Sequence, residues 1–255
     1  SPKIDENGQP FGGSVQDSAA LTARWNQERA KNIRLLEVRG TLPNSVTCPE
    51  TKVTFNTGKE GGTVPKKSKY ACGACGTVQD VLTTVKATGK TGPMAGYAVQ
   101  GYAPKGADKG EAYNGRFFAP YDLKLATQYD AAQREWDARK DADLADYWPR
   151  SAVPYGFMTG IANGDIREGH GFTHWWTMFN PRQLLVHAQL LKAIVTVGNH
   201  SWEAREFVVG AFQQYLRNQN SFCFWDTGYD KLVPHMSNNN YHPKNNLVEN
   251  CVFSK

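Results

Sequence analysis

The chain contains 255 residues, of which 40% are hydrophobic, and this is enough to bury a core in one or two domains. No apolar run approaches the roughly 20 residues that cross a bilayer, and residues 1–14 lack the apolar centre of a signal peptide, so we expect a cytoplasmic protein without a membrane partner. The net charge of +5 is modest, and five cysteines with a single Cys-x-x-Cys pair favour thiols or metal ligands over a disulfide framework.

Residues 1–43 are expected to form a flexible lead followed by a helix. Residues 1–14 are polar and contain several glycines, and the chain begins with Ser and Pro in place of an initiator Met, which suggests a segment of a longer protein. A helix is predicted over 15–38, with Gly40 as its stop. The apolar residues on one side of this helix are Leu21, Trp25, Ile33 and Leu36.

Residues 44–120 are expected to form a basic β module of short strands and turns. Strands are predicted at 53–55 and 97–99, with glycines between them. Residues 52–110 hold nine lysines and three acidic residues, a local excess of six positive charges that suits contact with DNA phosphates. The candidate DNA-binding lysines are Lys66, Lys67 and Lys69. The alternative is a solvated lysine loop that contacts nothing.

Three cysteines in this module have the spacing of a zinc ribbon. Cys72 and Cys75 are three positions apart with small residues between them and Gly76 after them, so both thiolates can turn toward one ion. Cys48 resembles half of a second knuckle, in which Thr51 stands where another cysteine is usual. A structural zinc site takes four ligands and these cysteines supply three. Two interpretations therefore remain: a ribbon that binds zinc and a ribbon that has lost its metal.

Residues 121–255 are expected to be helical, with an Asn-rich segment at the C-terminal end. An amphipathic pattern predicts a helix over 122–145, and residues 122–146 hold seven acidic and four basic side chains. Helices are also predicted over 181–197 and 202–217, after the N-caps Asn180 and Ser201, and their short connection favours an antiparallel hairpin. The predicted fold class is α+β, with a zinc-ribbon-like β module inserted among packed helices and a C-terminal helical hairpin.

Large side chains with polar tips gather just before the helix predicted at 181–197. They are His170, His174, Trp175 and Trp176. One interpretation is an aromatic cluster that holds the helix entry against the core. The other is that the helix N-terminus contacts a DNA phosphate, with Arg182 and Gln183 of its first turn as DNA-binding residues.

The Asn-rich segment near the C-terminal end offers further DNA-binding candidates. An amide side chain presents a donor and an acceptor together, which suits the edge of adenine, and a tyrosine ring can stack on an unpaired base. The candidates are Asn239, Asn240 and Tyr241. The alternative is that these asparagines cap turns, where a left-handed backbone is tolerated.

Three segments of the chain resemble one known family. Residues 178–185 read Met-Phe-Asn-Pro-Arg-Gln-Leu-Leu, residues 218–226 read Asn-Gln-Asn-Ser-Phe-Cys-Phe-Trp-Asp and are followed by 237–243, and the Tyr-Trp-Pro-Arg of 147–150 leads to the Pro-Tyr-Gly of 154–156. With these segments, most of residues 20–253 resembles the central region of adenine-specific DNA methylases that carry a zinc ribbon.

The resemblance implies an enzyme whose catalytic motifs lie outside this chain. Methyl transfer to adenine N6 needs a glycine-rich loop after a strand to seat S-adenosylmethionine and, in this family, an Asp-Pro-Pro-Tyr motif that receives the base. The chain contains no such tetrapeptide, and the glycines at 12–13 follow no apolar strand. We therefore expect no catalytic residue here, and S-adenosylmethionine bound only by the full-length family enzyme.

The predicted function is the non-catalytic middle segment of an S-adenosylmethionine-dependent DNA adenine-N6 methyltransferase, contributing DNA contact and scaffolding. The expected partners are DNA and a catalytic methyltransferase domain or subunit. The alternatives are a stand-alone nucleic-acid-binding module like a zinc ribbon and a protein-interaction piece. Flanking sequence distinguishes them, since a neighbouring cofactor loop and Asp-Pro-Pro-Tyr motif favour the first.

Overall fold

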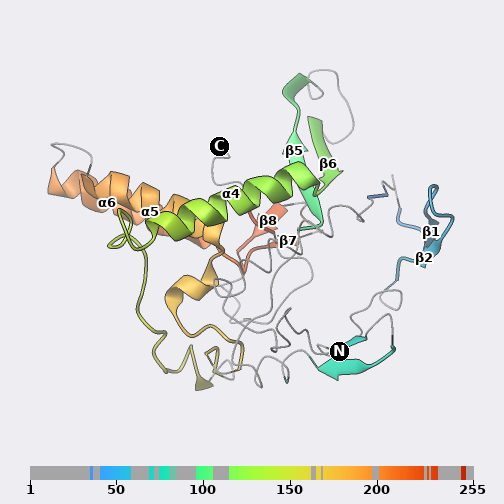
Figure 1. Ribbon diagram of the computed structural model, residues 1–255, viewed down its shortest axis with the longest axis horizontal. Coiled ribbons are helices and arrows are strands. Elements are labelled where there is room, and N and C mark those ends of the chain that lie inside the picture. Colours follow the sequence, from blue (N-terminus) through green and yellow to red (C-terminus); the bar gives the residue numbers. More distant parts are fainter. Residues whose placement is uncertain are drawn as a thin grey trace.

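A computed structural model describes residues 35–36, 41–58, 69–71, 75–80, 83, 96–105, 115–161, 165–167, 169–196, 201–226, 229, 231–234 and 248–250. This part of the chain combines α-helices with small antiparallel sheets, so the mixed α and β character is confirmed (Figure 1). The helix predicted over 15–38 falls almost entirely outside the described residues. None of the helices in these ranges is both long and apolar enough to cross a membrane.

The described strands pair with their neighbours in sequence as two-stranded antiparallel sheets. Their bounds are β1 Ser45–Thr47, β2 Thr54–Asn56, β3 Lys69–Ala71, β4 Val78–Asp80, β5 Ala98–Tyr102, β6 Arg116–Pro120, β7 Phe224–Asp226 and β8 Lys231–Val233. In register, Val46 lies opposite Phe55 in the first sheet, and Gln100 lies opposite Phe118 in the third. The strand predicted at 53–55 thus lies one residue later, and the strand predicted at 97–99 begins one residue later and continues to Tyr102.

The first described helix, α4, spans Leu123–Arg139 and begins at an aspartate cap. The side chain of Asp122 accepts a hydrogen bond from the backbone N–H of Leu125 at 2.9 Å, which pairs one of the donors that a helix start leaves free. The buried face of α4 packs against the helix α5, which spans Pro181–Thr196 (Figure 1).

The helix predicted over 122–145 is too long, because α4 ends at Arg139. Residues 140–148 instead form turns, in which the backbone N–H of Leu144 donates to the carbonyl of Arg139 at 3.1 Å. The Lys140 carbonyl accepts from Nε1 of Trp148 at 2.8 Å and from Nη2 of Arg150 at 3.1 Å. Side-chain donors from outside the helix therefore replace the backbone donors that a longer helix would supply.

The helices predicted near the C-terminal end are present. After α5, the helix α6 spans Trp202–Arg217, and its cap Ser201 accepts from the backbone N–H of Ala204 at 3.2 Å. Helix α5 packs against α6 as well as α4. Residues 197–200, which connect α5 to α6, lie outside the described residues, so the antiparallel hairpin stays a prediction.

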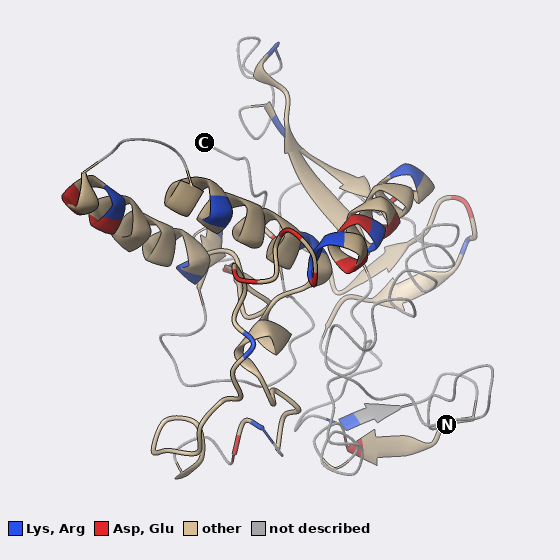
Figure 2. Ribbon diagram, turned by 60° about the vertical axis from the view of Figure 1, so that its left-hand side comes forward, with Lys and Arg blue, Asp and Glu red and all other residues tan. Residues whose placement is uncertain are grey.

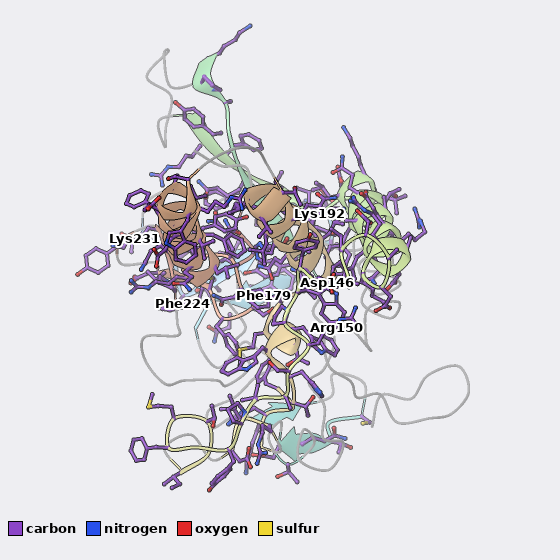
Figure 3. All side chains as sticks on the ribbon, turned by 90° about the vertical axis from the view of Figure 1, so that its left-hand side faces the viewer. Asp146, Arg150, Phe179, Lys192, Phe224 and Lys231 are labelled. Carbon is purple, nitrogen blue, oxygen red and sulfur yellow. The ribbon has the colours of Figure 1, made fainter. Side chains whose placement is uncertain are left out.

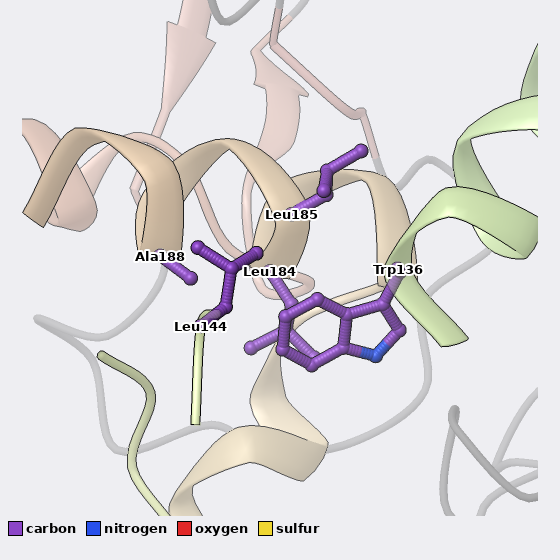
Figure 4. Packing of buried hydrophobic residues seen from close by; sticks show 5 residues of the cluster. All are labelled: Trp136, Leu144, Leu184, Leu185 and Ala188. Atoms are coloured by element: carbon purple, nitrogen blue, oxygen red, sulfur yellow. The ribbon is translucent and has the colours of Figure 1, made fainter. Parts of the chain in front are cut away.

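The hydrophobic core lies among the helices and the turns that join them. Figure 4 shows its first cluster, which consists of Trp136, Leu144, Leu184, Leu185 and Ala188. A second cluster consists of Val153, Ile166, Phe172, Met178 and Phe222, and Phe179 packs against both. By contrast, the β1–β2 and β5–β6 sheets expose large apolar side chains, among them Phe55, Phe117 and Phe118.

Charged side chains of both signs follow one another along α4 (Figure 2). Arg139 forms ion pairs with Glu135 at 2.9 Å and with Asp143 at 2.7 Å, and Lys140 pairs with Asp137 at 2.7 Å. These side chains are a third to a half exposed, so each pair contributes about 0–1 kcal/mol to stability. The acidic stretch is therefore a solvated helix face that neutralises most of its own charge.

Candidate functional site

The N-terminus of α5 is closed by two reciprocal hydrogen bonds. Asn180 Oδ1 accepts from the backbone N–H of Gln183 at 2.9 Å, and Gln183 Oε1 accepts from the backbone N–H of Asn180 at 3.0 Å. Both side chains are buried. This arrangement is a capping box, which gives acceptors to two backbone N–H groups at the helix start. A DNA contact through Gln183 requires this box to open.

A carboxylate of the chain itself lies beside the same helix end. The two oxygens of Glu249 accept from Nε and Nη2 of Arg182 at 2.7 and 2.8 Å, and Oε2 also accepts from Nδ2 of Asn180 at 2.8 Å. The anionic group expected at this N-terminus is thus supplied in this structure by Glu249, 67 residues away in sequence. A phosphate that binds Nε and Nη2 of Arg182 must therefore replace that carboxylate.

Two buried tyrosines surround this ion pair. The guanidinium carbon of Arg182 lies 5.2 Å from the ring centroid of Tyr129. Burial raises the pKa of Tyr121 to about 12 and raises the pKa of Tyr129 as well. Both phenols therefore stay protonated near neutral pH, and neither is suited to act as a general base. The network is built to hold the Glu249 segment against α5.

The segments that resemble the methylase family pack against one another. The backbone N–H of Ser221 donates to the carbonyl of Met178 at 2.9 Å, which joins the 218–226 segment to the 178–185 segment. One turn further along α5, Nε2 of His187 donates to the carbonyl of Gln219 at 2.8 Å. His187 is buried, and this burial lowers its pKa from 6.5 to about 4, so the ring is neutral.

Trp148, from the 147–150 segment, belongs to the same packed unit. Its ring lies edge-on to Trp136 at a centroid distance of 5.4 Å and to Trp176 at 6.3 Å. The guanidinium of Arg150 stacks on the Trp148 ring, with its central carbon 4.2 Å from the ring centroid. Nε1 of Trp148 donates to the Lys140 carbonyl. All three family-like segments therefore meet around α5.

The aromatic residues before α5 also pack on the core. The 3₁₀ helix η4 spans Trp175–Met178, and its Trp176 contacts the first core cluster while Trp175 contacts the second. His170 is buried, and Nδ1 of His174 is hydrogen-bonded to Oγ1 of Thr173 at 3.0 Å. These contacts support the interpretation that the aromatic cluster holds the helix entry against the core.

The predicted zinc ligands are described only in part. Cys48 is buried in a turn, where its backbone N–H donates to the Val53 carbonyl at 2.8 Å, and hydrogen bonding to Thr51 lowers the pKa of its thiol. Cys75 is exposed, and Cys72 lies outside the described residues. Within the described ranges, no group of three or more His, Cys, Asp or Glu residues is placed to hold a metal ion. Since Cys72 belongs to the predicted set, zinc stays a prediction.

The remaining DNA-binding candidates fall mostly outside the described residues. These are Lys66, Lys67, Asn239, Asn240 and Tyr241. Lys69 is exposed on β3, where it lies opposite Asp80 of β4 in the antiparallel register. Its position at the surface is compatible with a phosphate contact, which stays a prediction.

No family model, curated protein or solved structure matches this chain. The resemblance to the methylase family therefore stays a proposal that depends on the quoted segments. The residues that sequence reasoning missed are Glu249 and His187. Glu249 gives no local signal, because its partners lie more than sixty residues away, whereas His187 falls on the apolar side of a predicted helix and is predictable as a buried histidine.

Proposed function

We propose that the chain is the non-catalytic middle segment of an S-adenosylmethionine-dependent DNA adenine-N6 methyltransferase. There it contributes DNA contact and acts as a scaffold for a catalytic domain or subunit. The observation that carries the scaffold role is the use of the family-like segments inside the fold. Three of their amide side chains, which are the groups suited to contact a base, are hydrogen-bonded at helix ends: Asn180, Gln183 and Asn220.

Asn220 shows this commitment most clearly. Its Nδ2 donates to the carbonyls of Leu216 and Arg217, both at 3.0 Å, and its Oδ1 accepts from the backbone N–H of Phe222 at 2.9 Å. It thus adds a donor to the Leu216 carbonyl, which also accepts from the backbone N–H of Gln219, and gives a donor to the Arg217 carbonyl at the end of α6. Together with the capping box of Asn180, it fixes both ends of the α5–α6 region.

The surface of α6 supports contact with a further protein domain. Two of its large apolar side chains are strongly exposed, Trp202 at 70% and Phe207 at 82%. Val208, which follows Phe207, is also exposed. Large apolar side chains that stay exposed along one helix are typical of an interaction site. We assign this surface to the catalytic domain or subunit.

The basic β module supports the DNA-contact role. Its six-charge excess is larger than the net charge of the whole chain, so the rest of the molecule is slightly acidic. Phosphate contact by lysines of this kind gives affinity that does not depend on sequence and that weakens with salt.

The experiment is reconstitution of methyl transfer. The full chain is mixed with the product of the coding sequence that holds the cofactor loop and the Asp-Pro-Pro-Tyr motif, and transfer of labelled methyl from S-adenosylmethionine to adenine in DNA is measured. We expect no transfer by either part alone and transfer by the mixture. Phe207→Asp should abolish complementation, whereas Glu206→Gln, next to it on the exposed surface, should preserve it.

Two outcomes contradict the proposal. If the flanking coding sequence contains neither the cofactor loop nor the Asp-Pro-Pro-Tyr motif, there is no methyltransferase to which this segment could belong. Equal transfer with and without the chain shows that the catalytic part needs no scaffold.

A further inference from the structure

The hairpin of β5 and β6 projects beyond the helices in two views of the molecule, Figure 1 and Figure 3. Its pairing continues past both strand ends. The backbone N–H of Ala103 donates to the Gly115 carbonyl at 2.7 Å, and that of Tyr121 donates to the Tyr97 carbonyl at 3.2 Å. Because directly opposite residues of an antiparallel pair lie on the same face, this register fixes the side chains that each face carries.

One face of the hairpin leads into the contacts with α4. Gly101 lies opposite Phe117 on this face, and a Cβ atom on Gly101 would lie 2.2 Å from the Phe117 ring, so the ring lies over the glycine. Tyr121, four residues beyond Phe117, is buried, and its hydroxyl donates to the Leu125 carbonyl of α4 at 3.2 Å. This tyrosine anchors the base of the hairpin to the helix.

The opposite face, which we call the aromatic face, is largely open to solvent. Its residues are Ala98, Gln100 and Tyr102 of β5 and Arg116, Phe118 and Pro120 of β6. The side chains of Tyr102 and Phe118 are 61% and 54% exposed, and Gln100 is exposed between them. The apolar area of this face therefore comes mainly from two flat rings.

The two rings are placed to receive neighbouring bases. Tyr102 lies opposite Arg116, and Phe118 lies opposite Gln100, so the two aromatic residues are diagonal neighbours on adjacent strands. Diagonal neighbours are about 7–8 Å apart, which leaves room for one base on each ring. Exposed aromatic rings stack on the faces of unpaired bases, whereas a duplex hides these faces inside its own stack.

The charge of the hairpin suits a polyanion. Residues 96–105 and 115–120 contain Lys105 and Arg116 and no acidic residue. Lys105 is exposed three residues after Tyr102, and Arg116 lies opposite Tyr102 on the aromatic face. Grooves that bind single strands combine cations for the backbone with rings for the bases. The amide of Gln100 adds a donor and an acceptor suited to a base edge.

We propose that the aromatic face binds an unpaired DNA strand, with one base stacked on Tyr102 and the next on Phe118. Lys105 and Arg116 contact the phosphates, and Gln100 contacts a base edge. This inference rests on the DNA contact proposed above and names the form of DNA that the hairpin binds.

Fluorescence anisotropy of the full chain with a labelled oligothymidylate of about 12 nucleotides tests the stacking. Tyr102→Ala and Phe118→Ala should each weaken binding by about fivefold or more, because each removes the ring under one base. Neither should change the slope of affinity against salt, since no phosphate contact is lost. Both positions are exposed, so the fold should tolerate the substitutions.

Two matched variants control for other effects. Tyr102→Phe keeps the ring and should bind as the unmodified chain does. Phe55→Ala removes an exposed ring from β2, in the same basic module but in another sheet, and should also bind as the unmodified chain does. Absence of single-strand binding, unchanged affinity in both alanine variants of the aromatic face, or an equal loss in Phe55→Ala overturns the proposal.

A duplex of the same length, measured in parallel, separates this inference from the proposed function. If the duplex binds and the two alanine variants still bind the single strand as the unmodified chain does, the aromatic face fails while the DNA contact stands. If the duplex does not bind and single-strand binding depends on both rings, the duplex contact fails while the aromatic face stands. Tighter binding of an oligouridylate RNA than of the DNA strand contradicts DNA as the partner.

Discussion

Arg182 and Glu249 form a two-point ion pair between residues that are 67 positions apart in sequence. Nε and Nη2 of the guanidinium donate to the two carboxylate oxygens at 2.7 and 2.8 Å, and both side chains are less than one third exposed. The pair ties residues 248–250 to the first turn of α5, and the backbone N–H of Val248 adds a bond to the Cys223 carbonyl at 2.9 Å. The Glu249 carboxylate and one backbone hydrogen bond thus hold residues 248–250 against the helical core.

Removal of one partner of this pair should destabilise the fold. Glu249→Gln should lower the free energy of unfolding by about 1–3 kcal/mol, because it leaves a partly buried guanidinium without its counter-charge. Urea denaturation provides the measurement. The control is Lys192→Ala, which removes a more exposed pair with Asp143 and should cost about 0–1 kcal/mol. Equal effects of the two substitutions would show that the Glu249 contact adds no more than a surface pair.

Stability should fall with acid through His187. Its pKa is lowered by burial from 6.5 to about 4, so between these pH values the unfolded chain binds more protons than the folded chain. The stability that His187 contributes is therefore present above pH 6.5 and is lost as the pH falls toward about 4. The loss should amount to about 3 kcal/mol over this window.

Urea denaturation at a series of pH values measures this effect. His187→Gln should flatten the dependence between pH 7 and pH 4, whereas His174→Gln, a substitution at the half-buried histidine before α5, should leave it unchanged. The same slope in the His187 variant and the unmodified chain rules out His187 as the source.

Trp136 should be among the costliest single positions. Its side chain is 1% exposed at the centre of the first core cluster and meets Trp148 edge-on. Trp136→Ala should destabilise by about 3–5 kcal/mol, because it removes a large apolar side chain and leaves a cavity. On the exposed face of the same helix, Leu123→Ala should change stability by about 0.5 kcal/mol or less. Thermal unfolding of the two variants compares these effects, and similar melting temperatures contradict the placement of the core.

The lysines before the Cys-x-x-Cys pair should set the salt dependence of DNA binding. Replacement of Lys66, Lys67 and Lys69 by Ala should reduce the slope of log affinity against log salt by roughly two to three units if each contacts a phosphate. Filter binding to duplex DNA across a salt series measures the slope. The control removes the same charge outside the β module, by Ala at Lys124, Lys140 and Lys231. If the triple variant at Lys66, Lys67 and Lys69 leaves the slope unchanged, these lysines contribute to solubility and do not contact DNA.

The ribbon interpretation predicts up to one zinc ion per chain. Elemental analysis of the purified protein should detect it, and Cys72→Ser should release it because a thiolate ligand is lost. Cys223→Ala, at a buried thiol outside the ribbon, should retain the metal. If no zinc is found and the thiols of Cys48, Cys72 and Cys75 all react with a thiol reagent in the folded chain, the ribbon holds no ion.

The sequence by itself determined where the helices begin. Asn180 and Ser201 are N-caps, and each accepts from a backbone N–H three residues ahead, so the signal and its partner lie within one turn. The apolar side of α5, with Leu184 and Ala188, follows from helical spacing in the same way. Such local contacts are readable because they need no knowledge of the rest of the chain.

Only the tertiary structure decided how these helices end and what they meet. Helix α4 stops at Arg139 because Trp148 and Arg150 return from outside to bond the Lys140 carbonyl. The partner of Arg182 is Glu249, because the fold brings a carboxylate from the far end of the chain to the helix start. Both outcomes depend on contacts between residues distant in sequence, and neither helical spacing nor local capping encodes such contacts.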